Sequence, residues 1–587
     1  MSRTPRTPRV AAAGIAGLIG LASLTLLGAP ASYAESKTPK PPKAAKTVEL
    51  QLLAINDLHG NLEPPSGSGG RVATGGLLPP VGTAAPQPVT VDAGGVAFLA
   101  NHLNRLREGQ RETLTVAAGD MVGASPLISA LFHDEPTIEA LDLLGLDVAA
   151  VGNHEFDEGV DELLRLQDGG CHPTDGCQTG HEFGGADFPY LAANVVDRVT
   201  GEPILPAYEI ENVKGVKVGF IGMTLEGTDQ IVTQAGIAGV KFLDEAETAN
   251  RYVAELRAKG VETIVVLLHE GATQAPDPSA QNSLYDDCDN LNGPLVDIVK
   301  NFDDAIDVVV SGHTHQAYNC EGASEIDGKL VTSAASFGRV VSDLRLTLDR
   351  RTKDVVVARA DNVIVTRDSA DPELQELVDF YKVKAAPLAN RLVGQVTESI
   401  TRTGTDDNPL GNLIADAQLA ATSGPAVGGA VAAFMNPGGV RADLTFVPSG
   451  SEAPGAVTYG EAFTVQPFAN NLVTKSFTGQ QVLDLLNQQL AVRRFLQPAG
   501  ITYTYDPVAR TINPASVAIG GAPLDPAASY RITMNSFLAD GGDGFAVFKL
   551  GTSVLVGGID LDAFTDYLES RTAPVAPPST DRIRTAP

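Results

Sequence analysis

The stretch DVAAVGNHEFDEG, residues 147–159, joins a short apolar run to a cluster of polar side chains. The run from Val148 to Val151 has the length and apolarity of a buried strand, and it stops at Gly152. Four residues with coordinating or titratable side chains follow: Asn153, His154, Glu155 and Asp157. A strand that ends in such a cluster predicts a chemical site at its carboxyl end.

Runs of the same kind recur along the first half of the chain from Val48 onward. They include VELQLLAIND, TLTVAAGD, VKVGFIGMT, TIVVLLHEG and DVVVSGHTH, and stretches with apolar residues at helical spacing separate them. Alternating strands and helices predict an α/β layered domain.

Most of these runs end in residues that bind hard or borderline metals. The predicted ligands are Asp57, His59, Asp120, Asn153, His269, His313 and His315. One such His alone is more often a loop or core residue, but strand ends of a parallel sheet converge and bring the set together. Two Asp, one Asn and four His suffice for two divalent metal ions, with Asp120 as the bridging carboxylate.

His154 and Asp157 have a different predicted role. Because neighbouring side chains diverge, His154 faces away from the ligand Asn153 and toward the phosphate of a substrate. Asp157, three residues later, orients the imidazole if the segment turns into a helix. The pair is predicted to be catalytic, as a stabiliser of the transition state and a general acid. We interpret Glu155 as structural.

Length and charge limit the remaining possibilities. A chain of 587 residues exceeds one core, so at least two domains are expected. The formal net charge of −29 argues against nonspecific binding to nucleic acid or to acidic membrane surfaces. Three Arg, an apolar run and a small-residue site near Ala34 predict a signal peptide at residues 1–34, hence a secreted protein without stable membrane insertion. A membrane anchor is the alternative.

Four cysteines, an even number for an exported chain, suggest two disulfides. Three pairings are possible, and the most local one joins Cys171 to Cys177 and Cys288 to Cys320. A zinc site made of cysteines is the weaker alternative, because no C-x-x-C pair is present.

The predicted order of segments follows from these patterns. A Pro/Lys-rich linker at residues 35–47 comes first, and an α/β domain at residues 48–364 follows it. Next come a helical linker at residues 365–390, a second domain at residues 391–570 and a disordered tail at residues 571–587.

The motifs NDLHG, AGD, GNHEFD, LLHEG and SGHTH, in this order, resemble the calcineurin-like metallophosphoesterases. In the second domain, NPGGVR, QPFANNL and NSFLADGGDGF resemble the 5′-nucleotidases of that superfamily. The resemblance implies a four-layer α/β/β/α metallophosphoesterase domain, then a smaller α+β 5′-nucleotidase C-terminal domain that binds the nucleotide. It also implies two divalent metals, of which Zn, Mn or Co are expected, at the seven predicted ligands, and the His154–Asp157 dyad.

The second-domain motifs supply a predicted substrate site: Asn436, Gly438, Gly439, Arg441, Phe468, Asn470, Phe537 and Asp543. The glycines allow close approach of a ligand, and Arg441 offers a fork of donors for phosphate. Phe468 and Phe537 resemble the pair that sandwiches the base, Asp543 the acid that holds the ribose hydroxyls, and Asn470 a reader of the base edge. Core packing is the alternative for each Phe.

The sequence departs from the family before GNLIADA, where relatives carry an Arg and this chain has Asp406 and Asp407. Whether Arg402 takes over that phosphate contact stays open.

We predict a secreted nucleotide phosphohydrolase of the 5′-nucleotidase type, in which a metal-bound hydroxide attacks phosphorus. The alternatives are a 2′,3′-cyclic phosphodiesterase with 3′-nucleotidase activity, a UDP-sugar pyrophosphatase, and a non-catalytic nucleotide-binding surface protein. The oligomeric state is not predicted.

Overall fold

The computed structural model describes residues 46–586, apart from residues 66, 79–86, 233, 275–284, 405, 451 and 469. The predicted signal peptide and the linker up to residue 45 lie outside the described residues. The chain from Lys46 onward is joined by contacts into one unit. Among the helices of the described residues, none combines the length and the apolarity that a membrane span requires.

Two six-stranded sheets form the middle of the first domain, with strand orders β16-β15-β1-β4-β5-β6 and β13-β14-β12-β11-β9-β8. The first sheet contains β1 (Thr47–Ile55), β4 (Thr113–Ala118), β5 (Val148–Ala150), β6 (Tyr190–Leu191), β15 (Val340–Asp349) and β16 (Val355–Ile364). The second contains β8 (Tyr208–Val213), β9 (Val216–Thr224), β11 (Thr263–His269), β12 (Val308–Ser311), β13 (Ala317–Cys320) and β14 (Leu330–Ala334). In the first sheet β1, β4, β5 and β6 are parallel neighbours, and in the second β9, β11, β12 and β14 are.

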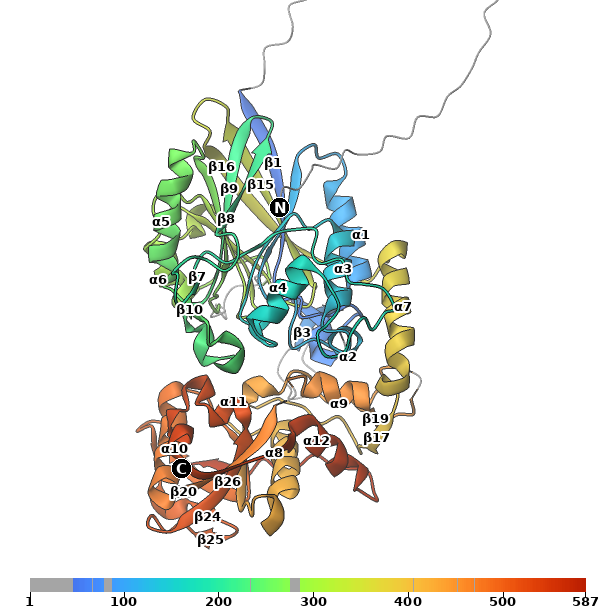
Figure 1. Cartoon of the computed structure of the whole chain (residues 1–587), viewed down its shortest axis with the longest axis vertical. Helices are drawn as coiled ribbons and strands as arrows, with labels where there is room; N and C mark the ends of the chain where they lie inside the picture. The colour runs from blue at the N-terminus through green and yellow to red at the C-terminus, as the bar shows by residue number, and fades with distance from the viewer. Residues whose placement is uncertain are drawn as a thin grey trace, which may run out of the picture. The chain divides into compact units, whose positions relative to one another are not determined.

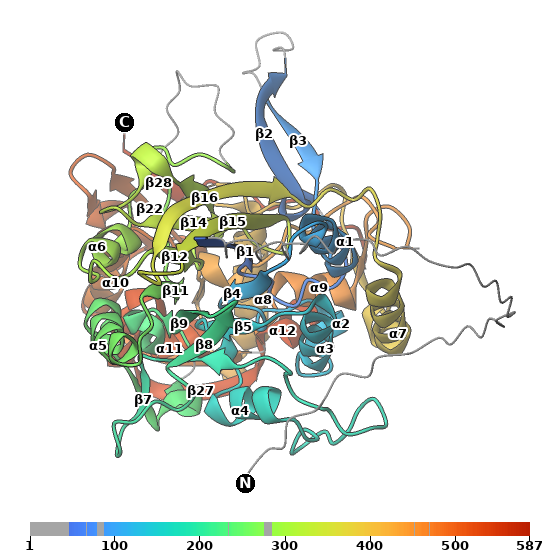
Figure 2. The ribbon, with the colours of Figure 1, turned by 90° about the horizontal axis from the view of Figure 1, so that it is seen from above.

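Helices cover the outer face of each sheet, and Figures 1 and 2 show the resulting layers. The helices on the first sheet are α1 (Val96–Arg107), α2 (Leu127–Ala130), α3 (Glu135–Leu144) and α4 (Val160–Asp168). Those on the second are α5 (Glu245–Ala258) and α6 (Pro294–Lys300). Two short pairs, β2 (Arg71–Leu78) with β3 (Gln87–Asp92) and β7 (Val195–Asp197) with β10 (Val240–Phe242), complete the domain. The predicted four-layer α/β/β/α arrangement is confirmed.

The period of two along β1 explains why its sequence is almost continuously apolar. Leu53 and Ile55 belong to the core shared with the helices, whereas Leu52 and Ala54 belong to the core between the two sheets. A strand buried on both faces needs apolar residues at every position. The polar residues that follow β1 therefore mark the place where its burial ends and the site begins.

The segment predicted as a helical linker contains α7 (Pro372–Ala389). Asp371 caps this helix by accepting from the backbone N–H groups of Glu373 and Leu374. Leu374 and Tyr381 are buried in the core of the first domain, and the Tyr381 hydroxyl donates to Glu139 at 2.9 Å. The connector is thus packed against the first domain along its length.

The second domain is built on a five-stranded mixed sheet with the order β21-β18-β26-β20-β27. Its strands are β18 (Ala432–Met435), β20 (Asn471–Thr478), β21 (Gln497–Ala499), β26 (Ser529–Asn535) and β27 (Thr552–Ile559). The helices are α8 (Pro409–Thr422), α9 (Tyr459–Val465), α10 (Gly479–Val492), α11 (Ser536–Ala539) and α12 (Asp560–Glu569). Smaller strands are β17 (Leu392–Gln395), β19 (Ala456–Thr458), β22 (Ile501–Asp506), β23 (Thr511–Ile512), β24 (Ala518–Ile519), β25 (Ala522–Pro523) and β28 (Ile583–Thr585).

The prediction of a disordered tail at residues 571–587 is wrong for the described residues up to 586. Strand β28 pairs in parallel with β22, and the Arg582 guanidinium donates to both carboxylate oxygens of Asp416 at 2.8 and 2.7 Å. The Pro-rich composition suggested disorder. Composition carries no information about the strand that pairs with β28, which is β22, about 80 residues earlier in the chain.

Both predicted disulfides are present. Cys171 is bonded to Cys177 and Cys288 to Cys320, and the described residues contain no free cysteine. The first closes a short surface loop after α4, and the second ties the loop before α6 to strand β13.

Candidate active site

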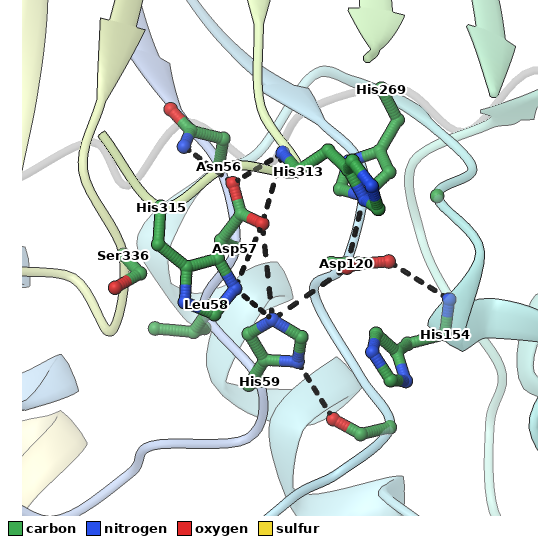
Figure 3. A network of polar contacts seen from close by, with 12 residues as sticks. Asn56, Asp57, Leu58, His59, Asp120, His154, His269, His313, His315 and Ser336 are labelled. Carbon is green, nitrogen blue, oxygen red and sulfur yellow. Dashed lines mark hydrogen bonds and ion pairs between the residues drawn. The ribbon is translucent and has the colours of Figure 1, made fainter. Parts of the chain in front are cut away.

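The seven predicted metal ligands come from the carboxyl ends of β1, β4, β5, β11 and β12. Six of them are drawn in Figure 3: Asp57, His59, Asp120, His269, His313 and His315. Their side chains face one another across a small space beyond the strand ends, with His154 beside Asp120. The structure therefore brings together residues that are up to 258 positions apart in the sequence.

One half of this donor cluster consists of Asp57, His59 and His315, whose ligand atoms lie within 4.8 Å of one another. The His59 ring faces the backbone oxygen of Gly123 through Nδ1 at 2.9 Å, which leaves Nε2 directed into the cluster. That Nε2 lies 3.8 Å from an oxygen of Asp57 and 3.0 Å from Nε2 of His315. Two imidazole nitrogens facing each other beside a carboxylate are suited to share a cation.

The other half consists of Asp120, His269, His313 and Asn153. The His269 ring donates from Nδ1 to the backbone oxygen of Ala118 at 2.8 Å, and its Nε2 lies 2.9 Å from Oδ2 of Asp120. The His313 Nδ1 lies 3.0 Å from the side-chain oxygen of Asn153. The same Asp120 oxygen is 3.6 Å from Nε2 of His59, so this carboxylate lies between the two halves.

The electrostatics of the cluster fit a site for cations. Burial raises the pKa of the Asp57 carboxyl to about 7. The charge of His269 opposes this increase, and the charge of Asp120 adds to it. Burial and the charge of His269 lower the pKa of His313 to about 3, so its ring is a neutral donor. The buried Nε2 of His269 makes no well-directed hydrogen bond within the described residues. Carboxylates and imidazoles that converge on one space match the donor preferences of two divalent ions.

The backbone of the cluster is strained. Asp57, His59, Asp120, His313 and His315 all have positive φ angles, between 47° and 70°. Residues other than glycine rarely adopt this conformation. Each instance costs about 1–3 kcal/mol and persists only where the surrounding structure enforces it. Such strain at five of the seven predicted ligands indicates that the loops are shaped for the geometry of the donors.

Glu155 holds two of these loops in place. Its carboxylate accepts from the backbone N–H groups of Asp120 at 2.9 Å, Met121 at 2.8 Å and Gly152 at 2.5 Å. The interpretation of Glu155 as structural agrees with these contacts.

Asn56 was missed by the sequence analysis. Its amide donates to Asp57 at 2.6 Å and its oxygen accepts from Ala334 at 2.7 Å, and its place beside Asp57 was the available signal.

The predicted catalytic pair, His154 and Asp157, lies beside the donor cluster. Nδ1 of His154 lies 2.8 Å from Oδ2 of Asp157, and the His154 backbone N–H donates to Asp120 at 2.9 Å. Burial lowers the pKa of His154, but the charges of Asp157 and Asp120 outweigh it and raise the value. The ring is therefore held in one orientation and is biased toward the protonated form.

All eight predicted substrate residues line one cavity of about 1070 Å³, together with His154, Asp157, Asn153 and His313. Phe468 stacks on His154 with ring centroids 5.7 Å apart, and Arg441 lies over the Phe468 ring at 5.7 Å. A Cβ atom on Gly439 would lie 2.4 Å from the terminal methyl group of Met435, so a larger residue there would require that flexible side chain to move. The cavity joins the predicted metal ligands to the predicted nucleotide residues.

The arginines that line this cavity, within the described residues, are Arg441 and Arg494. Arg402 lies outside the lining and donates to the backbone oxygen of Val440 at 3.1 Å. Arg494 was missed by the sequence analysis, because no motif contains it. It forms an ion pair with Asp543.

Comparison with known proteins agrees with this architecture. The model of the calcineurin-like phosphoesterase family matches residues 50–317, and that of the 5′-nucleotidase C-terminal domain matches residues 392–550. The fold, the donor cluster and these matches define a metal-dependent phosphoesterase. The chain belongs to the 5′-nucleotidase family, with its metallophosphoesterase domain followed by its C-terminal domain.

Three similar proteins illustrate the breadth of the family. The chain is 33% identical over 554 residues to Endonuclease YhcR of Bacillus subtilis, and the match covers 92% of this chain but only 41% of that protein. It is 33% identical over 564 residues to Cell wall protein Lmo0130 of Listeria monocytogenes, covering 90% and 68%. Among solved structures, a 5′-nucleotidase precursor from Thermus thermophilus matches with a TM-score of 0.71 and 27% identity, covering 92% of this chain and 99% of that one.

Proposed function

We propose that the chain hydrolyses nucleoside 5′-monophosphates to nucleoside and phosphate outside the cytoplasm. The observation that supports this most is the single cavity shared by His154, Asn153 and His313 on one side and Phe468 and Phe537 on the other. A nucleotide needs both a centre for its phosphate and an aromatic surface for its base. The two disulfides and the similarity to a cell wall protein support an extracytoplasmic location, and secretion through a signal peptide cleaved near Ala34 is part of the proposal.

We assign the donors to two sites. Asp57, His59 and His315 would hold one ion, and Asn153, His269 and His313 the other, with Asp120 between them. Divalent ions bound there, of which Zn, Mn or Co are expected, would polarise the phosphate and lower the pKa of a coordinated water.

The chain's own residues supply orientation and charge. His154, held by Asp157, would donate a proton or a hydrogen bond to the phosphoryl oxygens as negative charge develops on them. Arg441, which lies over the Phe468 ring and lines the same cavity, would bind the phosphate with its fork of N–H groups. Phe468 and Phe537 would stack on the base, and Asn470 would contact its edge.

A panel of substrates tests the proposal. Phosphate release is measured with AMP, ADP, ATP, 3′-AMP, 2′,3′-cyclic AMP and UDP-glucose, at one metal concentration. We expect the highest kcat/KM among these six for AMP. A clear preference for cyclic AMP with 3′-AMP, or for UDP-glucose, would replace this proposal with the corresponding alternative, and binding without turnover of any substrate would indicate a non-catalytic protein.

Replacing Phe468 or Phe537 with Ala is expected to raise KM for AMP by about tenfold or more, because base stacking contributes roughly 1–3 kcal/mol. Hydrolysis of p-nitrophenyl phosphate, which has no base, should change little. Phe495→Ala is the matched control, since this ring packs on Tyr505 with centroids 5.0 Å apart and does not line the cavity. Equal losses with both substrates would show that the two Phe residues act only in packing.

A further inference from the structure

The carboxylate of Asp543, the predicted ribose acid, already has a partner on each oxygen. Asn436 donates its amide N–H to Oδ2 at 3.1 Å, and Arg494 donates from Nη1 to Oδ1. The Asp543 side chain is only 5% exposed, whereas that of Arg494 is 50% exposed. The arginine therefore covers one oxygen of the carboxylate, and both residues line the cavity.

Arg494 occupies this place because of the turn that ends α10. Arg493 adopts a left-handed conformation, with φ of 57°, and redirects the chain so that Arg494 lines the cavity and Arg493 does not. Apart from the Nη1 bond to Asp543, no hydrogen bond of the Arg494 guanidinium occurs within the described residues. Its remaining N–H groups are available to a ligand in the cavity.

This arrangement offers a ligand more than an acceptor for the ribose diol. Each carboxylate oxygen of Asp543 accepts one hydrogen bond and keeps a further lone pair for a ribose hydroxyl. Arg494 adds only donors, in a planar fork with a permanent positive charge. The chemical group that such a fork binds best is a phosphate or carboxylate, through paired charge-assisted hydrogen bonds.

We propose that Arg494 binds a second phosphate, carried on the 2′ or 3′ oxygen of the ribose, so that the preferred substrates are nucleoside bisphosphates. This inference rests on the proposed function, since it assumes that the 5′-phosphate lies at the donor cluster. In the reaction, water attacks the 5′-phosphorus and the bond from phosphorus to the 5′-oxygen breaks. The 5′-oxygen takes up a proton, and free phosphate and the nucleoside 2′- or 3′-monophosphate are released.

The size of the cavity admits a ligand with two phosphates, and the charge of its walls makes a local cation necessary for such a ligand. The wall from the first domain contributes carboxylates, among them Asp157, Glu158, Glu162 and Glu270. A dianion at the ribose would be repelled by that wall unless a local cation offset it, and Arg494 is the cation beside Asp543. The volume of about 1070 Å³ is at the upper end of ordinary ligand pockets, so it accommodates the additional group.

Kinetics with matched variants test the proposal in the full, metal-loaded chain. Release of the 5′-phosphate is measured with AMP, adenosine 3′,5′-bisphosphate and adenosine 2′,5′-bisphosphate. We expect at least one bisphosphate to have about tenfold or more higher kcat/KM than AMP. Arg494→Gln should remove this preference by raising KM for the bisphosphate, with a much smaller effect on AMP. Arg493→Gln, which removes the same charge one residue away, should keep it.

Other kinetic outcomes overturn the inference. If AMP is hydrolysed as well as both bisphosphates, the second phosphate is not recognised although the proposed function stands. If Arg494→Gln impairs AMP and bisphosphates equally, Arg494 acts on the transferred phosphate instead.

Binding keeps the test decisive even if no 5′-monophosphatase activity is found. The full chain is titrated calorimetrically with adenosine, adenosine 3′-monophosphate and adenosine 2′-monophosphate, and we expect one monophosphate to bind about tenfold or more tightly than adenosine. Arg494→Gln should abolish the difference and Arg493→Gln should not. Equal affinity for all three ligands overturns the inference, as does release of phosphate from the monophosphate during the titration, because its phosphate would then occupy the donor cluster.

Discussion

Asp120→Ala is expected to abolish phosphate release and to remove bound metal at the same time. Asp120 is the carboxylate between the two halves of the donor cluster, 2.9 Å from Nε2 of His269 and 3.6 Å from Nε2 of His59. A ligand shared by two ions cannot be lost without weakening both sites, and the catalytic contribution of such ions amounts to several kcal/mol. Elemental analysis of the purified variant and a phosphate assay with AMP measure the two effects.

The control for this variant is Asp307→Asn. Asp307 is also a carboxyl with a raised pKa, about 8, because of burial and the nearby Asp354, but it precedes β12 at the opposite end from the cluster. It should keep both its metal content and its activity. If Asp120→Ala retained two ions per chain and measurable turnover, the bridging role assigned to Asp120 would be wrong.

His154→Ala is expected to lower kcat by about two to four orders of magnitude while the metal content stays at the wild-type level. Nδ1 of His154 is held by Asp157 at 2.8 Å, so the other ring nitrogen is free to act on the substrate. Rapid kinetics with AMP and elemental analysis of the same preparation give the two quantities.

A second histidine in the cavity provides the comparison. His133 also lines it and is likewise paired with carboxylates, Glu158 at 2.9 Å and Asp175 at 2.8 Å, but it takes no part in the donor cluster around Asp120. His133→Ala should therefore leave kcat nearly unchanged. Loss of metal in His154→Ala would mean that His154 is a ligand, and its division of roles with Asn153 would have to be revised.

The sequence predicts the location of the site because the rule behind it concerns the backbone. Parallel neighbours in a sheet end at one edge, so polar residues gather after β1, β4 and β5 of the first sheet and after β11 and β12 of the second. The packing of the two sheets on each other brings both groups together. The four layers follow for a similar reason, since a strand with a continuous apolar run, such as Leu52 to Ile55 in β1, must be covered on both faces.

Other features depend on information that is not local in sequence. Positive φ at Asp57 and His313 arises from the surrounding loops, and Asp and His tolerate that conformation without requiring it. The contact of Arg494 with Asp543 joins residues 49 positions apart through a turn with no motif. The order of residues 571–586 depends on distant partners such as the edge of β22 and the carboxylate of Asp416, which composition cannot reveal.

The central claim is that a two-metal centre in the first domain hydrolyses a nucleotide held by the second. The most direct measurement is a titration of chelated, dialysed chain with Mn²⁺, in which phosphate release from AMP and bound metal are followed together. The account predicts no activity without metal, and activity that rises in step with binding and saturates at two ions per chain. Full hydrolysis of AMP by the metal-free chain, or saturation without bound metal, would contradict it.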